Sequence, residues 1–167
     1  DICLEGHTII RQSQYLHNKK MSEAHYNPEV PFTTYVDFED IDKIIIKGRA
    51  LEGASRFNIW LQNGNATDPH DVAIVFDARF NFGVDNNTVV CNHKIGGNWG
   101  LEERNAPFFP FYPGDDFEIK IKIKDAFYQI QVNGQGVTEF NHKISVQTVD
   151  TLRIDGDVKL YEVKLKR

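Results

Sequence analysis

The sequence predicts an all-β fold, a two-sheet antiparallel jelly-roll sandwich, and three observations lead to that prediction. Several segments alternate apolar and polar residues with a period of two, which is typical of strands with one buried face. Turn sequences such as Asn133-Gly134 separate these segments. Between residues 30 and 167 the sequence shows no amphipathic helical pattern of ten residues or more. Many short strands joined by turns indicate a sandwich.

The expected strands follow one another along the chain. In order, they cover residues 57–62, 72–80, 88–92, 117–124, 127–132, 137–140, 151–154 and 158–165. The segment FEIKIKIK, at 117–124, alternates four apolar residues with one glutamate and three lysines, so its polar side forms a solvated outer face. Asn133-Gly134 indicates a hairpin because both residues tolerate positive φ. The turn Asp155-Gly156-Asp157 separates the last two strands.

Length and composition limit the classes of function. At 167 residues and 41% hydrophobic, the chain fits one domain with an ordinary core. The formal net charge of -5 argues against a nucleic acid or an anionic membrane as a partner attracted by bulk charge. No apolar stretch approaches the roughly 18 residues of a membrane span, and no signal peptide is visible. Cys3 and Cys91 lie far apart, which favours synthesis in a reducing compartment, the cytoplasm.

The first part of the chain differs from the rest. Residues 1–26 are polar, mixed in charge and without clear periodicity. We therefore expect an N-terminal extension over 1–26, loosely ordered, followed by a single domain over 27–167.

A run from Val72 to Arg104 holds the candidate site. Alternation places Val72, Ile74, Phe76, Ala78 and Phe80 on a core face. The opposite face then holds Ala73, Val75, Asp77 and Arg79. The strand 88–92 turns Asn92 outward and buries Val89 and Cys91, so Cys91 is expected to be structural. If the two strands are antiparallel neighbours, Asp77, Arg79 and Asn92 share one surface, with Trp99, Glu102 and Arg104 beside them.

These residue types match the chemistry of a sugar. A pyranose has an apolar face that an aromatic ring can cover, and a rim of hydroxyls that amides, carboxylates and guanidinium groups can bind. Trp99 follows Gly96-Gly97 and is the stacking candidate, while Glu102 and Arg104 project to the same side. Arg104 can also hold Glu102 in place by a bidentate pair. The alternative is that Trp99 is a core residue and Glu102-Glu103-Arg104 a solvated surface.

The run resembles the signature of the galectins, the β-galactoside-binding lectins. The resemblance covers residues 27–167 and includes NPEVPFT, KGRALEGASRFNIWLQNG, PFYPGDDFEIKIKI and TLRIDGDVKLYEV. It implies a concanavalin-like jelly roll that forms a carbohydrate-recognition domain with the sugar on one sheet. Five of seven motif positions match: Arg79, Asn92, Trp99, Glu102 and Arg104. In the family the Trp stacks on galactose, the Asn and Glu hold its 6-hydroxyl, and the Arg and Glu residues reach the neighbouring sugar.

The sequence departs from the family pattern at two positions that matter. Val75 stands where the family has His, and Asp77 where it has Asn; Gly83 also lacks a side chain that many members use. In the family this His, this Asn and the first Arg hold the axial 4-hydroxyl of galactose. Val75 cannot form a hydrogen bond, and an ionised Asp77 can only accept one, so it can pair with Arg79 instead. Two lost bonds predict roughly 30- to 150-fold weaker lactose binding.

The resemblance implies galactose-containing glycans or glycoproteins as partners, no cofactor, no metal and no catalysis. It also implies that the chain can form a homodimer and can reach the cell exterior by a non-classical route. One alternative is a galectin-fold interaction module whose sugar site has degenerated. Another is a glycosidase, which needs a carboxylate pair about 5–10 Å apart, but no E-x-D-x-x-E strand is present. The six histidines show no metal-ligand spacing.

Overall fold

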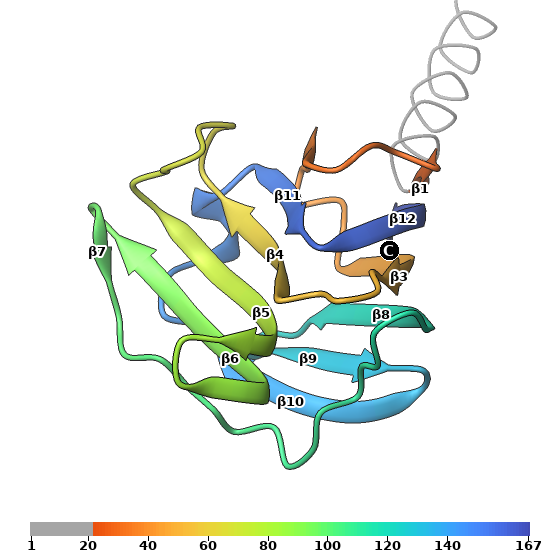
Figure 1. The fold of residues 1–167 in the computed structure, drawn as a ribbon. Helices are drawn as coiled ribbons and strands as arrows, with labels where there is room; N and C mark the ends of the chain where they lie inside the picture. The colour runs from red at the N-terminus through yellow and green to blue at the C-terminus, as the bar shows by residue number, and fades with distance from the viewer. Residues whose placement is uncertain (1–21) are drawn as a thin grey trace, which may run out of the picture.

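The computed structural model describes residues 22–167, which form two six-stranded sheets packed face to face (Figure 1). The strands are β1 (Ser22–Tyr26), β2 (Phe32–Tyr35), β3 (Lys43–Ala50), β4 (Arg56–Gln62), β5 (Val72–Phe82), β6 (Asp85–Ile95), β7 (Asn98–Trp99), β8 (Asp116–Ile123), β9 (Phe127–Val132), β10 (Gln135–Asn141), β11 (Thr151–Gly156) and β12 (Val158–Lys166). The first sheet has the order β1-β12-β3-β8-β9-β10 and the second β2-β11-β4-β5-β6-β7. All of these neighbours pair antiparallel, which confirms the predicted two-sheet sandwich.

Aromatic rings fill the space between the sheets. Phe57 on β4 and Phe117 on β8 come from different sheets and stack with their centroids 5.2 Å apart. The ring of Phe111 meets both of them edge-on at 5.1 and 5.3 Å. Such pairs contribute about 0.5–1.5 kcal/mol each beyond the burial of apolar area. This cluster packs the second sheet against the first and so supports, from below, the sheet that carries the candidate site.

A β-bulge at the start of β5 reverses part of the predicted alternation. Ala73 was expected outside the core but belongs to the core cluster, whereas Val72, expected in the core, is fully buried but lies outside that cluster. The register explains the reversal. Val72 pairs with Lys94 and Val75 with Asn92, so β5 advances three residues where β6 advances two, and β5 has one extra residue. From Val75 onward the alternation is as predicted, and every second side chain reaches the outer face of the sheet.

The first sheet begins before the predicted start of the domain. Residues 22–26 were assigned to a loosely ordered extension, yet they form β1 and pair with β12 from Ser22↔Lys166 to Tyr26↔Glu162. Backbone hydrogen bonds to β12 hold these residues in a strand, and their polar sequence does not indicate one. Residues 1–21 of the predicted extension lie outside the described residues.

Several local predictions agree with the structure. Asn133 and Gly134 have φ of 51° and 79°, as a tight hairpin between β9 and β10 requires. Within residues 22–167 the single helical element is a short 3-10 turn, Val146–Thr148, and there is no helix long and apolar enough to cross a membrane. Cys91 is buried on the core side of β6, and burial raises the pKa of its thiol to about 12.

Candidate functional site

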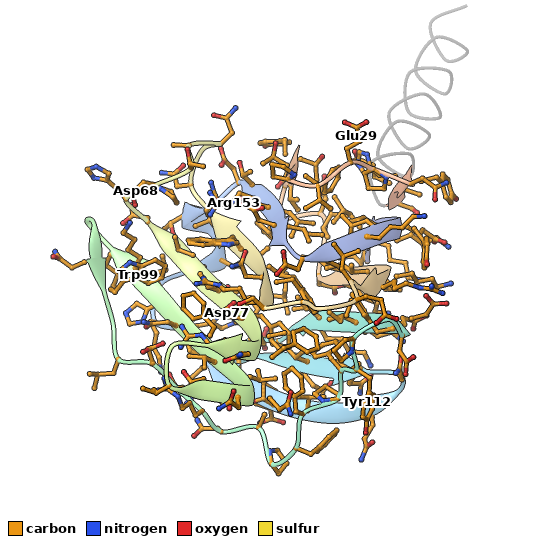
Figure 2. All side chains as sticks on the ribbon, viewed as in Figure 1. Glu29, Asp68, Asp77, Trp99, Tyr112 and Arg153 are labelled. Atoms are coloured by element: carbon orange, nitrogen blue, oxygen red, sulfur yellow. The ribbon has the colours of Figure 1, made fainter. Side chains whose placement is uncertain are left out.

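The outer face of the second sheet carries a hollow of about 430 Å³ over β4, β5 and β6. Figure 2 shows Trp99 and Asp77 on this face. The hollow is lined by Arg56, Trp60, Val75, Asp77, Arg79, Val90, Asn92, Trp99, Gly100 and Glu102. Five of the six predicted site residues are therefore in the lining, and Arg104 lies directly behind Glu102, 3.5 Å from its carboxylate.

Strand register brings the predicted residues together. On one side of β5, Val75 pairs with Asn92 and Asp77 with Val90 of β6. On the other side, β4 places Trp60 opposite Val75, Asn58 opposite Asp77 and Arg56 opposite Arg79. Because these side chains lie directly across from one another, they form rows on a single face.

The segment after β7 returns along β6 and adds the remaining groups. The backbones of Cys91 and Glu103 exchange two hydrogen bonds, of 2.9 and 2.8 Å. This bridge fixes the neighbours of Glu103, so that Glu102 and Arg104 lie over β6 although they belong to no regular strand.

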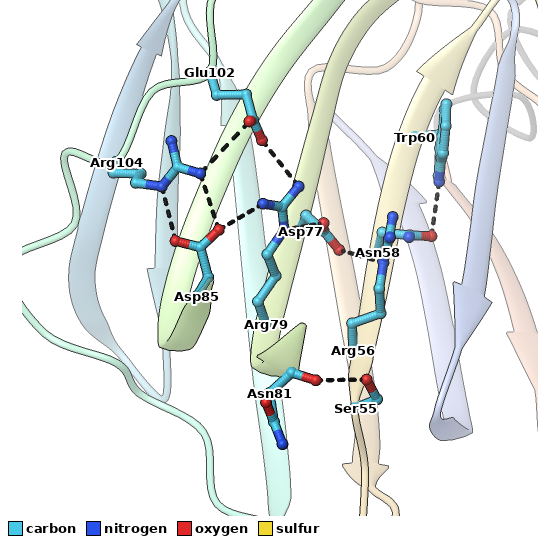
Figure 3. Close-up of polar contacts among 10 residues, drawn as sticks. All are labelled: Ser55, Arg56, Asn58, Trp60, Asp77, Arg79, Asn81, Asp85, Glu102 and Arg104. Atoms are coloured by element: carbon cyan, nitrogen blue, oxygen red, sulfur yellow. Dashed lines mark hydrogen bonds and ion pairs between the residues drawn. The ribbon is translucent and has the colours of Figure 1, made fainter. Parts of the chain in front are cut away.

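Three carboxylates surround the guanidinium of Arg79. Its Nε donates to Asp77 at 2.8 Å, one Nη to Asp85 at 2.7 Å and the other to Glu102 at 2.9 Å (Figure 3). Burial lowers the pKa of Arg79, but the hydrogen bonds to Asp77 and Asp85 outweigh it, and the net pKa is raised. The guanidinium is held from three sides and is therefore fixed in position.

Asp85 is a site residue that sequence reasoning missed. Both of its oxygens accept hydrogen bonds from Arg104, at 3.0 and 2.9 Å, and one also accepts from Arg79. The hydrogen bonds from Arg104 and then Arg79 lower the pKa of Asp85 to about 2. The sequence suggested that Arg104 could hold Glu102 by a bidentate pair; the two contact each other, but through one nitrogen at 3.5 Å, because the fork of Arg104 binds Asp85. Asp85 looked like part of a polar turn, Asp-Asn-Asn, and gave no further signal.

Asp77 acts as a counter-ion within this network. It is only 3% exposed, and the pairing with Arg79 that the sequence suggested is present. Its second oxygen lies 3.3 Å from Nε of Arg56, whose guanidinium stacks over the ring of Phe82 at 4.0 Å. The carboxylate of Asp77 is thus placed between two arginines, and little of it reaches solvent.

Two tryptophans form the aromatic part of the site. Trp99 is 48% exposed and meets Trp60 edge-on, with 5.6 Å between ring centroids. The indole N–H of Trp60 donates to Oδ1 of Asn58 at 2.7 Å, and the guanidinium of Arg153 lies 4.0 Å over its ring. Trp60 was not singled out from the sequence, although the inward positions around it on β4 already indicated that it faces outward.

Asn92 and Gly100 hold the segment that follows Trp99. Nδ2 of Asn92 donates to the carbonyl of Gly100 at 2.9 Å, and Oδ1 accepts from the backbone of His93 at 2.8 Å. A Cβ on Gly100 would overlap the ring of His93. A larger residue at this position would therefore have to move the ring of His93, and glycine lets the loop that presents Trp99 pack closely against it.

Comparison with known proteins assigns the chain to a family. The family model described as Galactoside-binding lectin matches residues 29–165. The chain belongs to the galectin family. Its domain is 34% identical to pig galectin-4 over 143 residues, covering 84% of the chain and 42% of that relative. It is 31% identical to the 32 kDa beta-galactoside-binding lectin of Haemonchus contortus, covering 90% of the chain and 50% of that relative. The chain thus spans about half the length of these relatives.

Solved galectin structures share the fold. Galectin LEC-6 of Caenorhabditis elegans superposes with a TM-score of 0.75 at 25% identity, covering 86% of this chain and 96% of that one. Sheep galectin-11 gives 0.72 at 24% identity, covering 83% and 99%, and supports the fold alone. Galectins are lectins rather than enzymes. Among residues 22–167 of this galectin, no group of three or more His, Cys, Asp or Glu side chains could hold a metal ion.

Proposed function

We propose that this galectin binds β-galactoside-containing glycans in the hollow over β4, β5 and β6, with weakened or altered demands at the 4-hydroxyl. The observation that carries the proposal is the half-exposed indole of Trp99 at the edge of a hollow that also contains Arg79 and Glu102. An aromatic face beside charged donors and acceptors matches the apolar face and the hydroxyl rim of one pyranose ring.

Enough hydrogen-bonding capacity remains for such a ligand. A guanidinium has five N–H donors, and the three carboxylate contacts of Arg79 leave two of them free. Nδ2 of Asn92 has two hydrogens and gives one to Gly100. Glu102 contributes a side chain that is 41% exposed and can accept from hydroxyls. These three groups line the same hollow as Trp99, where a ring stacked on the indole could meet them.

The hollow is apolar where the family places its His. Val75 faces the hollow, and its cross-strand neighbour Trp60 has its one N–H bound to Asn58. Neither side chain offers a donor or acceptor to an axial hydroxyl. Asp77, in place of the family Asn, is engaged by Arg79 and Arg56. The 4-hydroxyl therefore loses two partners, and we expect lactose to bind roughly 30- to 150-fold more weakly than to a member with the full motif.

A protein-interaction module is the second candidate. Val84 in the turn between β5 and β6 is 93% exposed, and Leu101, next to Glu102, is 89% exposed. Exposed apolar side chains of this kind suit a protein partner. In that case binding to a glycoprotein would survive enzymatic removal of its glycans.

Calorimetric titration with lactose tests the proposal, with Trp99→Ala as the site variant. Tyr112→Ala is the matched control, because Tyr112 is an exposed aromatic residue outside the hollow (Figure 2). We expect weak binding that Trp99→Ala abolishes and Tyr112→Ala preserves. Equal loss in both variants, or binding to a glycoprotein that persists after deglycosylation, would refute a sugar site at Trp99.

A further inference from the structure

The outer face of the first sheet, on the opposite side of the sandwich, divides into two halves of different charge balance. In one half the charges pair with each other. Arg49 donates to Asp116 at 2.8 Å, Lys47 lies 3.9 Å from Glu118, and Lys164 lies 2.8 Å from Glu162. This half needs no external counter-ion.

The other half consists of lysines. Lys166 on β12 pairs in register with Lys43 on β3, and Lys43 pairs with Lys122 on β8, so three lysines lie side by side on consecutive strands. Lys120 lies two residues from Lys122 on the same face of β8. Within residues 22–167, none of these four amines has a carboxylate within 4 Å. We call Lys43, Lys120, Lys122 and Lys166 the lysine stripe.

The fold does not require this arrangement. Neighbouring strands are about 4.8 Å apart, so each cross-strand lysine pair brings two positive charges close together, which is destabilising. Uncharged residues occupy equivalent positions of the same face: Ile45 lies opposite Lys120, and Gln129 lies opposite Lys122. A row of like charges on a protein with a net charge of -5 is therefore a local feature that folding alone does not explain.

We propose that the lysine stripe binds a sulfated polysaccharide. Sulfate groups along a linear chain supply the anions that the amines lack within the described structure, and binding them would relieve the repulsion between Lys43 and its two neighbours. A thin chain contacts only the stripe, so the negative charge elsewhere on the molecule opposes it little.

Other polyanions fit the stripe less well. An anionic bilayer is an extended surface that the net charge of -5 would oppose. Among the described residues, Tyr26 on β1 is the one large apolar side chain exposed on the strands of the first sheet, and a single tyrosine offers little area to enter a bilayer. Single-stranded nucleic acid needs aromatic rings on which bases stack, and the lysine stripe has none. Because the stripe and the hollow lie on opposite faces of the sandwich, both can be occupied at once.

The test measures the anisotropy of a fluorescein-labelled heparin fragment as protein is added, at 50 and 200 mM NaCl. The stripe variant changes all four lysines to Gln. The control variant changes Lys47, Arg49, Lys159 and Lys164 to Gln on the same face, so both variants reach the same net charge. We expect the stripe variant to lose at least tenfold in affinity and the control less than threefold. If all four lysines contact sulfates, binding by the unmodified protein should weaken roughly 50- to 150-fold between the two salt concentrations.

Three results would overturn the proposal. They are an equal loss of heparin affinity in the two variants, displacement of heparin by lactose, and tighter binding to phosphatidylserine vesicles than to heparin. The first would indicate bulk charge, the second the hollow and the third a membrane. Thermal unfolding and lactose titration of both variants show whether the domain remains folded. Binding that the stripe variant loses while its unfolding temperature does not fall and its lactose affinity stays unchanged supports the proposal.

Discussion

Introducing the family's His and Asn at positions 75 and 77 should strengthen lactose binding. The variant is Val75→His with Asp77→Asn. Position 75 lies opposite Asn92 and Trp60 and lines the hollow, so a His there can reach a ligand hydroxyl. An Asn at 77 keeps an acceptor for Arg79 and gains an N–H₂ donor, because the amide has both functions.

The magnitude follows from the number of bonds restored. Each position regains one hydrogen bond to the 4-hydroxyl, at about 1–1.5 kcal/mol, and the pair together about 2–3 kcal/mol. This corresponds to roughly a 30- to 150-fold lower dissociation constant. The change has a cost in stability, since Arg79 and Arg56 lose a buried counter-ion, and we expect the unfolding free energy to fall by about 1–3 kcal/mol.

Titration calorimetry should compare lactose with cellobiose, which differs in the configuration at the relevant 4-hydroxyl. We expect the double variant to gain affinity for lactose and little for cellobiose, with each single variant gaining part of the effect. Adding Trp99→Ala should remove the gain. An unchanged lactose affinity in a folded double variant, or an equal gain for both sugars, would show that Val75 and Asp77 do not control recognition of this hydroxyl.

Three further predictions concern the support of the site. Asp85 has a pKa lowered to about 2, so its ionised form stabilises the fold above about pH 4, and that stabilisation is lost as the pH falls through 2. Asp85→Asn should therefore lower the unfolding free energy at pH 7 by about 1–2 kcal/mol. Urea titrations of both proteins at pH 7 and 2.5 should show this difference shrinking in acid. Gly100→Ala should displace the loop against His93, costing about 1–3 kcal/mol and weakening any ligand that stacks on Trp99, as unfolding and titration would show. Phe57→Ala should destabilise the domain by about 3–5 kcal/mol in urea unfolding, whereas Tyr112→Ala should change it little.

The alternation of apolar and polar residues was sufficient to predict much of the fold and the common face of the site. It correctly assigned Val75, Asp77, Arg79 and Asn92 to one surface, because no bulge interrupts β5 between Val75 and Arg79. It failed at Ala73, which belongs to the core cluster because an inserted residue shifts the alternation by one there. Nothing in a period-two pattern marks a bulge, since its cause is the pairing with two neighbouring strands.

The missed site residues share a different cause. Asp85, Trp60 and Arg56 each contribute through a partner on another strand, and sequence spacing does not give cross-strand partners. Asp85 replaced Glu102 as the bidentate partner of Arg104 because the turn between β5 and β6 brings its carboxylate between two guanidinium groups. That placement depends on the register of the hairpin, which only the folded structure supplies.

Charge balance separates the ligands proposed for the two faces. In the hollow and directly around it, the carboxylates of Asp77, Asp85 and Glu102 match the guanidinium groups of Arg56, Arg79 and Arg104 in number, and they contact one another. An anionic ligand entering there would be repelled by three carboxylates that already neutralise the guanidinium groups, whereas a neutral hydroxyl can use the donors and acceptors that remain. The lysine stripe has the opposite property, because among residues 22–167 its amines have no carboxylate partners to displace. A neutral pyranose in the hollow and a sulfated chain on the stripe are therefore the ligands that each face can bind without breaking its own ion pairs.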